Sequence, residues 1–376
     1  MSQKSHQVII IGGGLAGLIS ALHLSRANID VLVIEKDNYP KHKVCGEYIS
    51  NEVLPYLKQL GFDPFQHGAK DIKQLSFSSV SNKEITTTLP LGGFGISRYT
   101  MDAKLAKLAA SKGASVINGT VSEVTFSEDK FFIKTRSGER YQSTIVIGAF
   151  GKRSNIDVNL SRKFLKKKSP YLAVKAHYKG DFPDDKVSLH NFKGGYCGVS
   201  KVDTDHINMC YITDYKTFKK YKNIYDFQTE LMSQNKHLRA AFEKYELVFD
   251  KPITIGQVSF STKKAVEKHM LMCGDSAGMI HPFAGNGMSM AIRSAHMASK
   301  LIIRYLNGEV SSREHLEKEY QRKWRAEFHS RLNVGHVIAA FLKLPIVSDI
   351  MINIMKAFPS LLPSVIKKTH GKPMTV

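Results

Sequence analysis

Three glycines near the start of the chain have the spacing that lets backbone amides approach a phosphate. Gly12, Gly14 and Gly17 form a G-x-G-x-x-G pattern, with Leu15 and Ala16 between the last two glycines. Side chains at the glycine positions would keep a pyrophosphate away from the backbone amides, and the amino end of a following helix favours negative charge. The pattern therefore predicts a turn that binds the pyrophosphate of a dinucleotide.

The segments around this turn have the order that such a site requires. An apolar strand over residues 7–11 precedes the turn, a helix over 15–27 follows it, and a second strand over 30–34 leads to Glu35. Strand, turn, helix, strand and acid complete one βαβ unit within about thirty residues. We expect Glu35, with Lys36 beside it, to lie at the adenosine ribose, whose hydroxyls the carboxylate would bind.

A second glycine-containing segment follows an apolar strand that we expect over residues 270–273. Its notable residues are Gly274, Asp275, Pro282, Gly285, Asn286, Gly287 and Met288. In this segment the sequence resembles the p-hydroxybenzoate hydroxylase and geranylgeranyl reductase superfamily of FAD-dependent oxidoreductases. The resemblance implies that Asp275 binds the ribityl hydroxyls of FAD and that the residues from Pro282 to Met288 line the flavin. A helix amino end there favours the anionic reduced flavin, so the expected cofactor is FAD.

A third element narrows the resemblance. The segment from Pro40 to Gly46 is similar to the Pro-x-x-Lys-x-Cys-Gly element of the reductases and some related hydroxylases in this superfamily, which implies that Cys45 and Gly46 lie beside the flavin ring. By the same resemblance, Arg98 reaches the phosphate and ribityl region. Val121 is expected to lie under the adenine through backbone contacts.

One departure from the superfamily concerns the electron donor. Phe150 stands where many hydroxylases carry an aspartate that is tied to both FAD and NADPH, and no second glycine-rich dinucleotide motif occurs in the chain. Direct use of NAD(P)H is therefore in doubt, and a separate electron donor is the alternative.

Three residues near the expected flavin site are candidates for catalysis. Cys45 has a thiol beside the ring, although packing is at least as good an explanation. Tyr196 is either a substrate contact or a core tyrosine, and His281 is either a proton carrier or a structural histidine. The four cysteines have no metal-ligand spacing, so we predict no metal site.

The elements that must position these residues predict an α/β fold with interleaved domains. We expect a three-layer Rossmann-type FAD domain, an antiparallel substrate sheet with strands within 72–89 and 171–212, and a helical C-terminus. Expected helices include 47–60, 101–111, 226–242, 288–307 and 313–332. The expected ranges are 1–70, 95–165 and 262–332 for the FAD domain, 71–94 and 166–261 for the substrate domain, and 333–376 for the C-terminal extension.

The charge of the chain bears on its partners. It carries 54 basic and 33 acidic residues, a formal net charge of +21. Such a charge favours nucleic-acid binding, but no zinc-finger spacing, basic zipper or aromatic RNA-binding strand accompanies it, so we predict no nucleic-acid partner. Two interpretations stay open: a solvated basic face, and attraction to an anionic membrane.

The last apolar stretch, over residues 339–366, is interrupted by Lys343, Asp349, Lys356 and three prolines. No uninterrupted run approaches the roughly 20 residues of a membrane span. The stretch predicts short helices that cap the substrate lobe or rest on a membrane. Scattered cysteines and the lack of a signal-peptide core predict a cytoplasmic protein. The alternative expectation is a cytoplasmic protein that associates with a membrane.

Three hypotheses about function follow from the residues and the resemblance. The leading hypothesis is an FAD-dependent monooxygenase that hydroxylates a small lipophilic molecule of phenolic or polyketide-like type. The runner-up is a geranylgeranyl-reductase-like enzyme that saturates isoprenoid double bonds. Cys45, Gly46 and Phe150 favour this runner-up, whereas the short chain and the lack of a Trp in the segment from Phe192 to Gly198, which resembles the flavin-covering strand of the reductases, weaken it. The third is a basic peripheral membrane protein in which FAD is structural.

Overall fold

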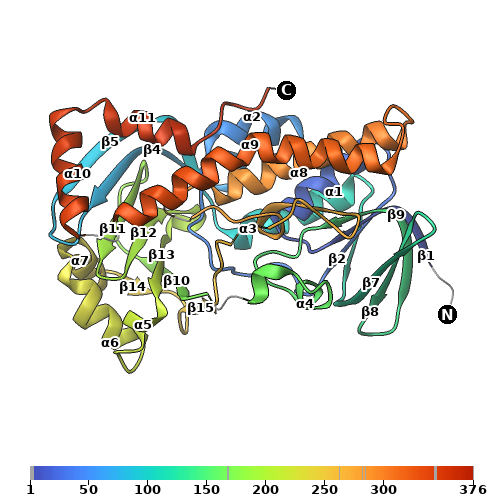
Figure 1. Ribbon diagram of the computed structural model, residues 1–376. Coiled ribbons are helices and arrows are strands. Elements are labelled where there is room, and N and C mark those ends of the chain that lie inside the picture. The colour runs from blue at the N-terminus through green and yellow to red at the C-terminus, as the bar shows by residue number, and fades with distance from the viewer. Residues whose placement is uncertain are drawn as a thin grey trace.

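The computed structural model describes residues 4–166, 169–261, 263–281, 283, 285–342 and 345–375. One lobe is built on a sheet with the strand order β16-β17-β9-β1-β2-β6, in which β17, β9, β1, β2 and β6 run parallel (Figure 1). β7 and β8 join it as an antiparallel hairpin through β9. The strands of this first sheet are β1 (Lys4–Ile11), β2 (Val31–Glu35), β6 (Ser115–Asn118), β7 (Val121–Ser127), β8 (Lys130–Thr135), β9 (Arg140–Gly148), β16 (Val266–Glu267) and β17 (Met270–Met272).

The parallel strands form because they are apolar on both faces. Val8 to Ile11 of β1 and Val31 to Ile34 of β2 are buried, as expected for strands covered on both sides. The helices α1, α3, α8 and α9 pack together along one face, and Figure 1 shows the β7–β8 hairpin on the opposite side of the sheet. The lobe thus has the three layers that the sequence predicts.

A second, mostly antiparallel sheet forms the other lobe. Its order is β14-β10-β13-β12-β11-β4-β5-β3, with β15 also paired to β10 and with β11 and β4 parallel. The strands are β3 (Tyr48–Ser50), β4 (Lys70–Ser78), β5 (Glu84–Gly95), β10 (Tyr171–Lys179), β11 (Lys186–Phe192), β12 (Gly195–Lys201), β13 (Ile207–Asp214), β14 (Glu246–Leu247) and β15 (Ile253–Gly256). The chain leaves the first sheet and returns to it, so the lobes are interleaved as predicted.

The helices follow the sequence pattern with four differences. They are α1 (Leu15–Arg26), α2 (Leu54–Gln59), α3 (Arg98–Ser111), α4 (Asn155–Asn159), α5 (Tyr215–Phe218), α6 (Ile224–Asp226), α7 (Lys236–Lys244), α8 (Gly287–Leu306), α9 (Arg313–Leu342), α10 (Pro345–Ala357) and α11 (Leu361–Thr369). The helix expected over 226–242 is broken between α6 and α7, where the Asn235 side chain caps α7. α9 extends ten residues beyond the expected end at 332.

The helix expected over residues 47–60 is wrong for its first half. Glu47 has a φ of +55°, which ends any helical path there, and Tyr48–Ser50 pairs with β5 instead. The Ser50 hydroxyl then accepts a hydrogen bond from the Glu52 N–H at 3.3 Å, and the α-helix begins only at Leu54. The strand β3, which lies within the range 1–70 expected for the FAD domain, thus belongs to the second sheet.

The helix expected to begin near Met101 starts three residues earlier. The Ser97 side chain caps it by accepting from the Thr100 N–H at 3.1 Å. Asp102 is therefore not at the helix start; it is buried one turn later, where it pairs with Arg98.

The junction between β17 and α9 yields a stability prediction. The fully buried Tyr320 donates a hydrogen bond to the Met272 carbonyl at 2.6 Å and lies 3.3 Å from the Cys273 sulfur. Tyr320→Phe leaves that buried carbonyl without this donor, and we expect the free energy of unfolding to fall by about 1–3 kcal/mol. Denaturant unfolding measures the loss. Tyr225→Phe, at a side chain that is 72% exposed, is the control and should change little; equal stability of the two variants would contradict the assignment.

Candidate functional site

The glycine turn between β1 and α1 has the shape of a phosphate cradle. A Cβ atom added to Gly12 would lie 2.4 Å from the Ala149 carbonyl oxygen, and one added to Gly17 would lie 2.0 Å from the Gly12 carbonyl oxygen. The backbone therefore tolerates no side chain at either position. At Gly14 the nearest atom to an added Cβ is a guanidinium nitrogen of Arg98, at 3.7 Å, so the space over this residue is open and faces a cation. The turn fits a pyrophosphate at the amino end of α1.

Glu35 closes the turn from behind. Its carboxylate accepts hydrogen bonds from the Gly13 N–H at 2.5 Å and from the Asp37 N–H at 3.0 Å. The Tyr39 hydroxyl donates to the Gly13 carbonyl from the other side. Glu35 thus orders the turn itself, and its contact with a ribose stays a prediction.

A single elongated cavity runs from this turn into the second lobe. The first lobe contributes the predicted residues Gly14, Leu15, Ala16, Cys45, Gly46, Arg98, Gly274, Asp275, Gly285, Gly287 and Met288 to its wall. The second sheet and the C-terminal helices contribute mainly apolar side chains, among them Leu75, Phe77, Leu89, Val187, Leu189, Ile352, Met355, Leu362 and Ile366. Segments that are far apart in the sequence therefore share one site.

Other predicted site residues lie outside this wall. Gly12 and Gly17 are inside the turn, Glu35 backs it, and Lys36 and Val121 lie farther along the first sheet. The Asn286 side chain points elsewhere, because its amide donates to the Thr369 carbonyl at 2.9 Å and so holds the end of α11. Pro282 lies outside the described residues.

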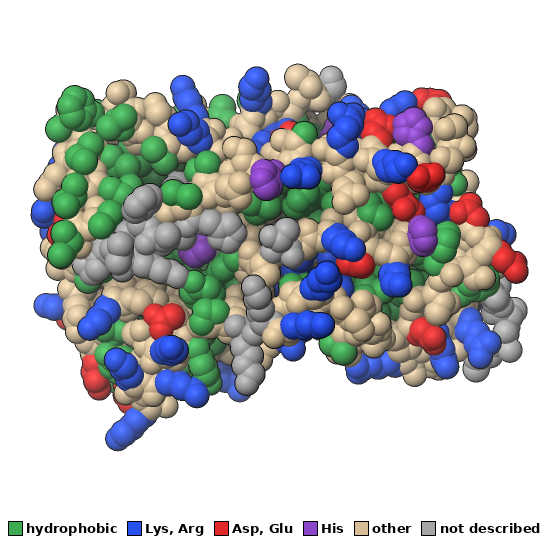
Figure 2. Space-filling view, viewed as in Figure 1, with side chains coloured by type: hydrophobic (Ala, Val, Ile, Leu, Met, Phe, Trp, Pro, Cys, Tyr) green, Lys and Arg blue, Asp and Glu red, His purple; other side chains and the backbone are tan. Residues whose placement is uncertain are grey.

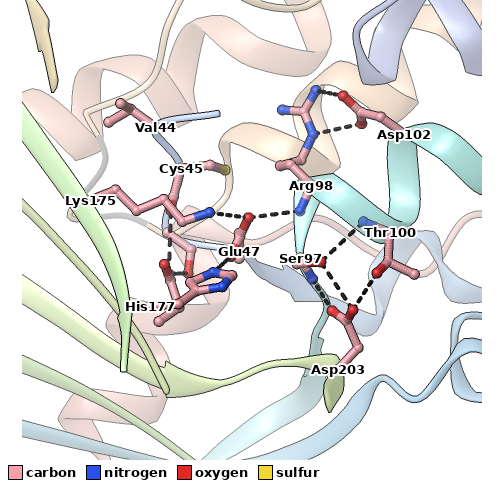
Figure 3. A network of polar contacts seen from close by, with 12 residues as sticks. Val44, Cys45, Glu47, Ser97, Arg98, Thr100, Asp102, Lys175, His177 and Asp203 are labelled. Atoms are coloured by element: carbon pink, nitrogen blue, oxygen red, sulfur yellow. Dashed lines mark hydrogen bonds and ion pairs between the residues drawn. The ribbon is translucent and has the colours of Figure 1, made fainter. Parts of the chain in front are cut away.

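A buried ion cluster fixes the loop that carries Cys45 and Gly46. The Glu47 carboxylate is paired with the Lys175 ammonium and lies 2.8 Å from His177 Nε2, while its first oxygen accepts the Arg98 N–H at 2.7 Å (Figure 3). The side chains of Glu47, Lys175 and His177 are buried. Burial alone would raise the pKa of Glu47, but the charge of Lys175 and the hydrogen bond with His177 lower this pKa to about 2. The cluster joins β10 of the second sheet to the flavin-side loop and to α3.

Two further side chains of the second lobe bind the loop that carries Cys45 and Gly46 and the start of α3. The Asn208 side chain on β13 donates to the Gly46 carbonyl at 2.8 Å and to the Cys45 carbonyl at 3.3 Å. Asp203, at the turn between β12 and β13, accepts the Ser97 N–H at 2.5 Å and the Thr100 hydroxyl at the start of α3 (Figure 3). The lobes are thereby joined by polar contacts on both sides of the loop.

Arg98 is held in place toward the glycine turn. Its guanidinium donates two hydrogen bonds of 2.7 Å to the Asp102 carboxylate, one turn along α3. Lys43 adds a second cation at 3.1 Å from Asp102. Because Asp102 satisfies only one edge of the guanidinium, the planar group retains N–H donors for a phosphate.

The turn that carries Asp275 rests on a buried lysine. Lys263 donates to the Asp275 carbonyl at 2.7 Å and to the Lys152 carbonyl at 2.9 Å, and its ammonium lies 4.3 Å from the centre of the Phe164 ring. Burial lowers the pKa of Lys263 to about 8. Asp275 itself lines the cavity. Its contact with the ribityl hydroxyls of FAD stays a prediction.

The three catalytic candidates occupy different positions. Cys45 is half-buried and lines the cavity. Tyr196 also lines it, with its ring edge-on to Phe283 at 4.9 Å, and burial raises the pKa of its phenol well above 10, so the hydroxyl stays protonated. His281 does not line the cavity; it packs against Phe260 at 4.6 Å and accepts from the Phe283 N–H at 3.4 Å. A packing role fits His281 better.

Sequence reasoning missed Lys175, His177, Asp203 and Asn208. A signal for the first two was present: they alternate within the otherwise apolar strand of residues 171–178, so they share one face, and a fully buried lysine is rare unless it is paired. Nothing local marks Asp203 or Asn208. Among the described residues, no group of three or more potential ligands is placed to hold a metal ion.

Comparison with known proteins finds relatives along nearly the whole chain. A family model described as an FAD binding domain matches residues 5–329. The chain is 25% identical to conditioned medium factor receptor 1 of Dictyostelium discoideum, over 92% of this chain and 73% of that protein. It is 27% identical to a digeranylgeranylglycerophospholipid reductase of Methanosarcina mazei, over 94% and 86%. A solved flavin-dependent brominase superposes with a TM-score of 0.79 at 20% identity, over 97% and 93%.

These matches confirm several expectations from the sequence. The family match confirms FAD as the cofactor and an oxidoreductase as the class of enzyme. The structural likeness confirms the α/β fold, and the family match with the reductase relatives confirms the resemblance to the hydroxylase and reductase superfamily. The roles of individual residues toward FAD stay predictions, which the next experiments test.

The first prediction concerns Asp275. If its carboxylate binds the ribityl hydroxyls, Asp275→Ala loses charge-assisted hydrogen bonds and should weaken FAD binding by about 10- to 100-fold. Flavin absorbance after dialysis and titration of the apoprotein measure the affinity. Asp250→Ala, an exposed acid on the second lobe, is the matched control. Unchanged affinity in the Asp275 variant would remove its assigned role.

The second prediction concerns Glu47. Its folded pKa of about 2 lies below its ordinary value of 4.5, so its contribution to stability is full above 4.5 and is lost as the pH falls toward 2. Glu47→Gln leaves Lys175 buried without its counter-charge and should cost about 3–5 kcal/mol near neutral pH. Unfolding measured against pH should show this difference from wild type shrinking across that window. Glu309→Gln, at an exposed ion pair, is the control; a difference independent of pH would refute the assignment.

Proposed function

The chain belongs to the FAD binding domain family, and from this premise we propose that it is an FAD-dependent reductase that saturates double bonds of a long isoprenoid lipid. The observation that carries the proposal is the apolar cavity, which continues from Cys45 and Gly46 past the second sheet to α10 and α11. A long aliphatic chain would bury its surface along such a wall. A small polar substrate would leave that wall without a partner.

Sequence similarity supports the same direction. The relative from Methanosarcina mazei is a digeranylgeranylglycerophospholipid reductase, and the segment from Pro40 to Gly46 has the form that the reductases carry. Phe150 also departs from the hydroxylase pattern. Its ring lies close to Gly148, where an added Cβ would be 3.0 Å from it.

The residues of the chain would serve such a reaction in three ways. Reduced FAD, when bound, supplies a hydride equivalent to one carbon of the double bond, and the other carbon needs a proton. Cys45 and Tyr196 carry exchangeable protons on the cavity wall and are the candidates for that donor. The Glu47 cluster keeps the Cys45 loop in place, and the apolar side chains exclude water from the reacting carbons.

Hydroxylation of a lipophilic phenolic or polyketide-like molecule is the second candidate. One observation favours it: Tyr196 and Phe283 form an aromatic corner at the cavity, against which a planar ring can stack. The two candidates differ in what reoxidises the reduced cofactor. A reductase passes the electrons to the lipid, whereas a hydroxylase passes them to oxygen and needs the bound substrate for productive turnover.

Anaerobic reoxidation separates the candidates. The purified protein is reduced with dithionite without oxygen and mixed with a geranylgeranyl phospholipid. Recovery of the oxidised flavin spectrum, with a mass gain of two hydrogens per reduced double bond, is the result expected. Reoxidation only by air, with oxygen incorporated into a phenolic probe, would favour hydroxylation. Reoxidation by neither lipid nor phenol would favour a structural FAD. In the same anaerobic cuvette, NADPH added in place of dithionite tests whether NADPH reduces the bound flavin.

A cavity-filling variant tests whether the apolar wall holds the chain. Val187 is buried on β11 and lines the cavity near Leu362 and Ile366 of α11. Val187→Trp fills part of the cavity, so a twenty-carbon isoprenoid would lose contacts with the wall and overlap sterically with the indole ring. The kcat/KM for this substrate should fall by about tenfold or more, and the kcat/KM for a ten-carbon chain should fall less. Val158→Trp, at an exposed position on α4, is the control. Equal losses for both chain lengths would contradict the proposed path.

A further inference from the structure

One face of α10 exposes a row of large apolar side chains. Ile346, Ile350 and Ile354 recur every four residues and are 76%, 52% and 46% exposed. Phe358 continues the row just past the end of the helix at 62%, and Leu361 begins α11 at 41%. Residues spaced by four lie on one side of a helix, so Ile346, Ile350 and Ile354 share one face of α10. These three side chains, together with Phe358 and Leu361 beyond the end of the helix, are here called the α10 stripe. Figure 2 shows apolar side chains gathered at this end of the molecule.

We infer that the α10 stripe is a membrane-docking surface, which seats the protein on the face of an anionic lipid bilayer. A soluble domain has no reason to keep five such side chains in water, and a row of this kind is typical of a surface with an apolar partner. An amphipathic helix that lies in the interface buries such a row among lipid headgroups and upper acyl chains.

The charges around the stripe match an anionic surface. From Pro345 to Thr369 the chain has one acidic residue, Asp349, and three basic ones, the exposed Lys356, Lys367 and Lys368. Asp349 is turned toward the protein, where its carboxylate accepts a hydrogen bond from the Ser81 hydroxyl at 2.5 Å. The exposed charge of this region is therefore basic, which favours negatively charged headgroups.

The geometry fits a helix that lies on a bilayer. α10 has 13 residues and is thus about 20 Å long, short of the roughly 30 Å of a hydrocarbon core. Within the described part of the chain no single helix is long and apolar enough to cross a membrane. α10 and α11 reach that length only together, and they are bent by 115°.

The inward side of the same two helices forms the end wall of the cavity. Met351, Ile352 and Met355 of α10 and Leu362 and Ile366 of α11 line it. One layer of helix thus separates the stripe from the space that holds the substrate. Together with the proposed function, on which this step rests, the arrangement places the apolar end of the cavity beside the bilayer from which an isoprenoid lipid would be delivered.

Flotation with vesicles tests the docking surface directly. Wild-type holoprotein should float with vesicles of phosphatidylcholine and phosphatidylglycerol at low salt. The variant Ile346→Glu, Ile350→Glu and Ile354→Glu combined should partition at least about tenfold less, because charged side chains resist burial in the interface. The variant Val158→Glu, Tyr215→Glu and Tyr225→Glu combined, which adds the same three charges at residues that are 55%, 47% and 72% exposed elsewhere, is the matched control. Flavin absorbance and circular dichroism confirm that each variant is folded.

Two further measurements decide the outcome. Lys356→Ala, Lys367→Ala and Lys368→Ala should each weaken binding to anionic vesicles by about fivefold and leave binding to pure phosphatidylcholine unchanged. Wild-type protein that stays unbound at low salt would overturn the inference. So would light scattering that shows a dimer which the glutamate variant dissociates, since the stripe would then be a contact between two copies.

Flotation needs no turnover, so its failure and a failure of the reductase proposal are separate results. If both hold, the glutamate variant should lose activity toward a geranylgeranyl phospholipid in vesicles at least about tenfold more than toward the same lipid in detergent micelles. An equal loss in both would overturn delivery from the bilayer, while docking itself would still be judged by flotation.

Discussion

The burial of one carboxylate holds the two lobes of this protein in register. Glu47 sits between sheets, out of contact with water, and its charge is compensated by Lys175, by His177 and by the Arg98 N–H. Removing one partner of such a cluster leaves an uncompensated buried charge, which is far more costly than any exposed ion pair. Cys45 and Gly46 directly precede Glu47 in the chain, and Arg98 is the first residue of α3. The position of the flavin-side loop relative to the glycine turn therefore depends on this interaction.

The C-terminal helices complete the site from the opposite end. α11 is held by the first lobe, since Asn286 binds the Thr369 carbonyl and the Met374 N–H donates to the Glu52 carbonyl at 2.8 Å. α10 is tied to the second lobe through Asp349. The helices span the two lobes over the cavity, and the outer side of α10 is apolar as well, which the proposed docking on a bilayer accounts for. Shape, anchoring and composition of this segment are thus explained together.

Prediction from the sequence was reliable where the determining contacts are local. The turn at Gly12, Gly14 and Gly17 and the strands around it occur where the pattern placed them, because close backbone approach and apolar periodicity act within a few residues. It was wrong over residues 47–53, where a helical pattern gives way to the positive φ of Glu47 and to pairing with β5. Asp102 is the buried partner of Arg98 within α3 and of the more distant Lys43, and neither pair was predicted from the sequence. Over residues 47–53 a distant strand outweighed the local preference.

The sequence by itself determined the fold class and a dinucleotide cofactor, since a pyrophosphate turn and an acid at the end of β2 are short and chemically specific. It pointed to FAD through the resemblance of the segment around Asp275 to a flavoprotein superfamily. Only the tertiary structure decided what surrounds the flavin. The cavity draws its wall from the glycine turn, from the second sheet and from helices more than three hundred residues along the chain. Which side chains of a buried strand or a terminal helix face that space depends on how the layers pack. That is why the pairing of Lys175 and His177 with Glu47 and the two faces of α10 became visible only in three dimensions.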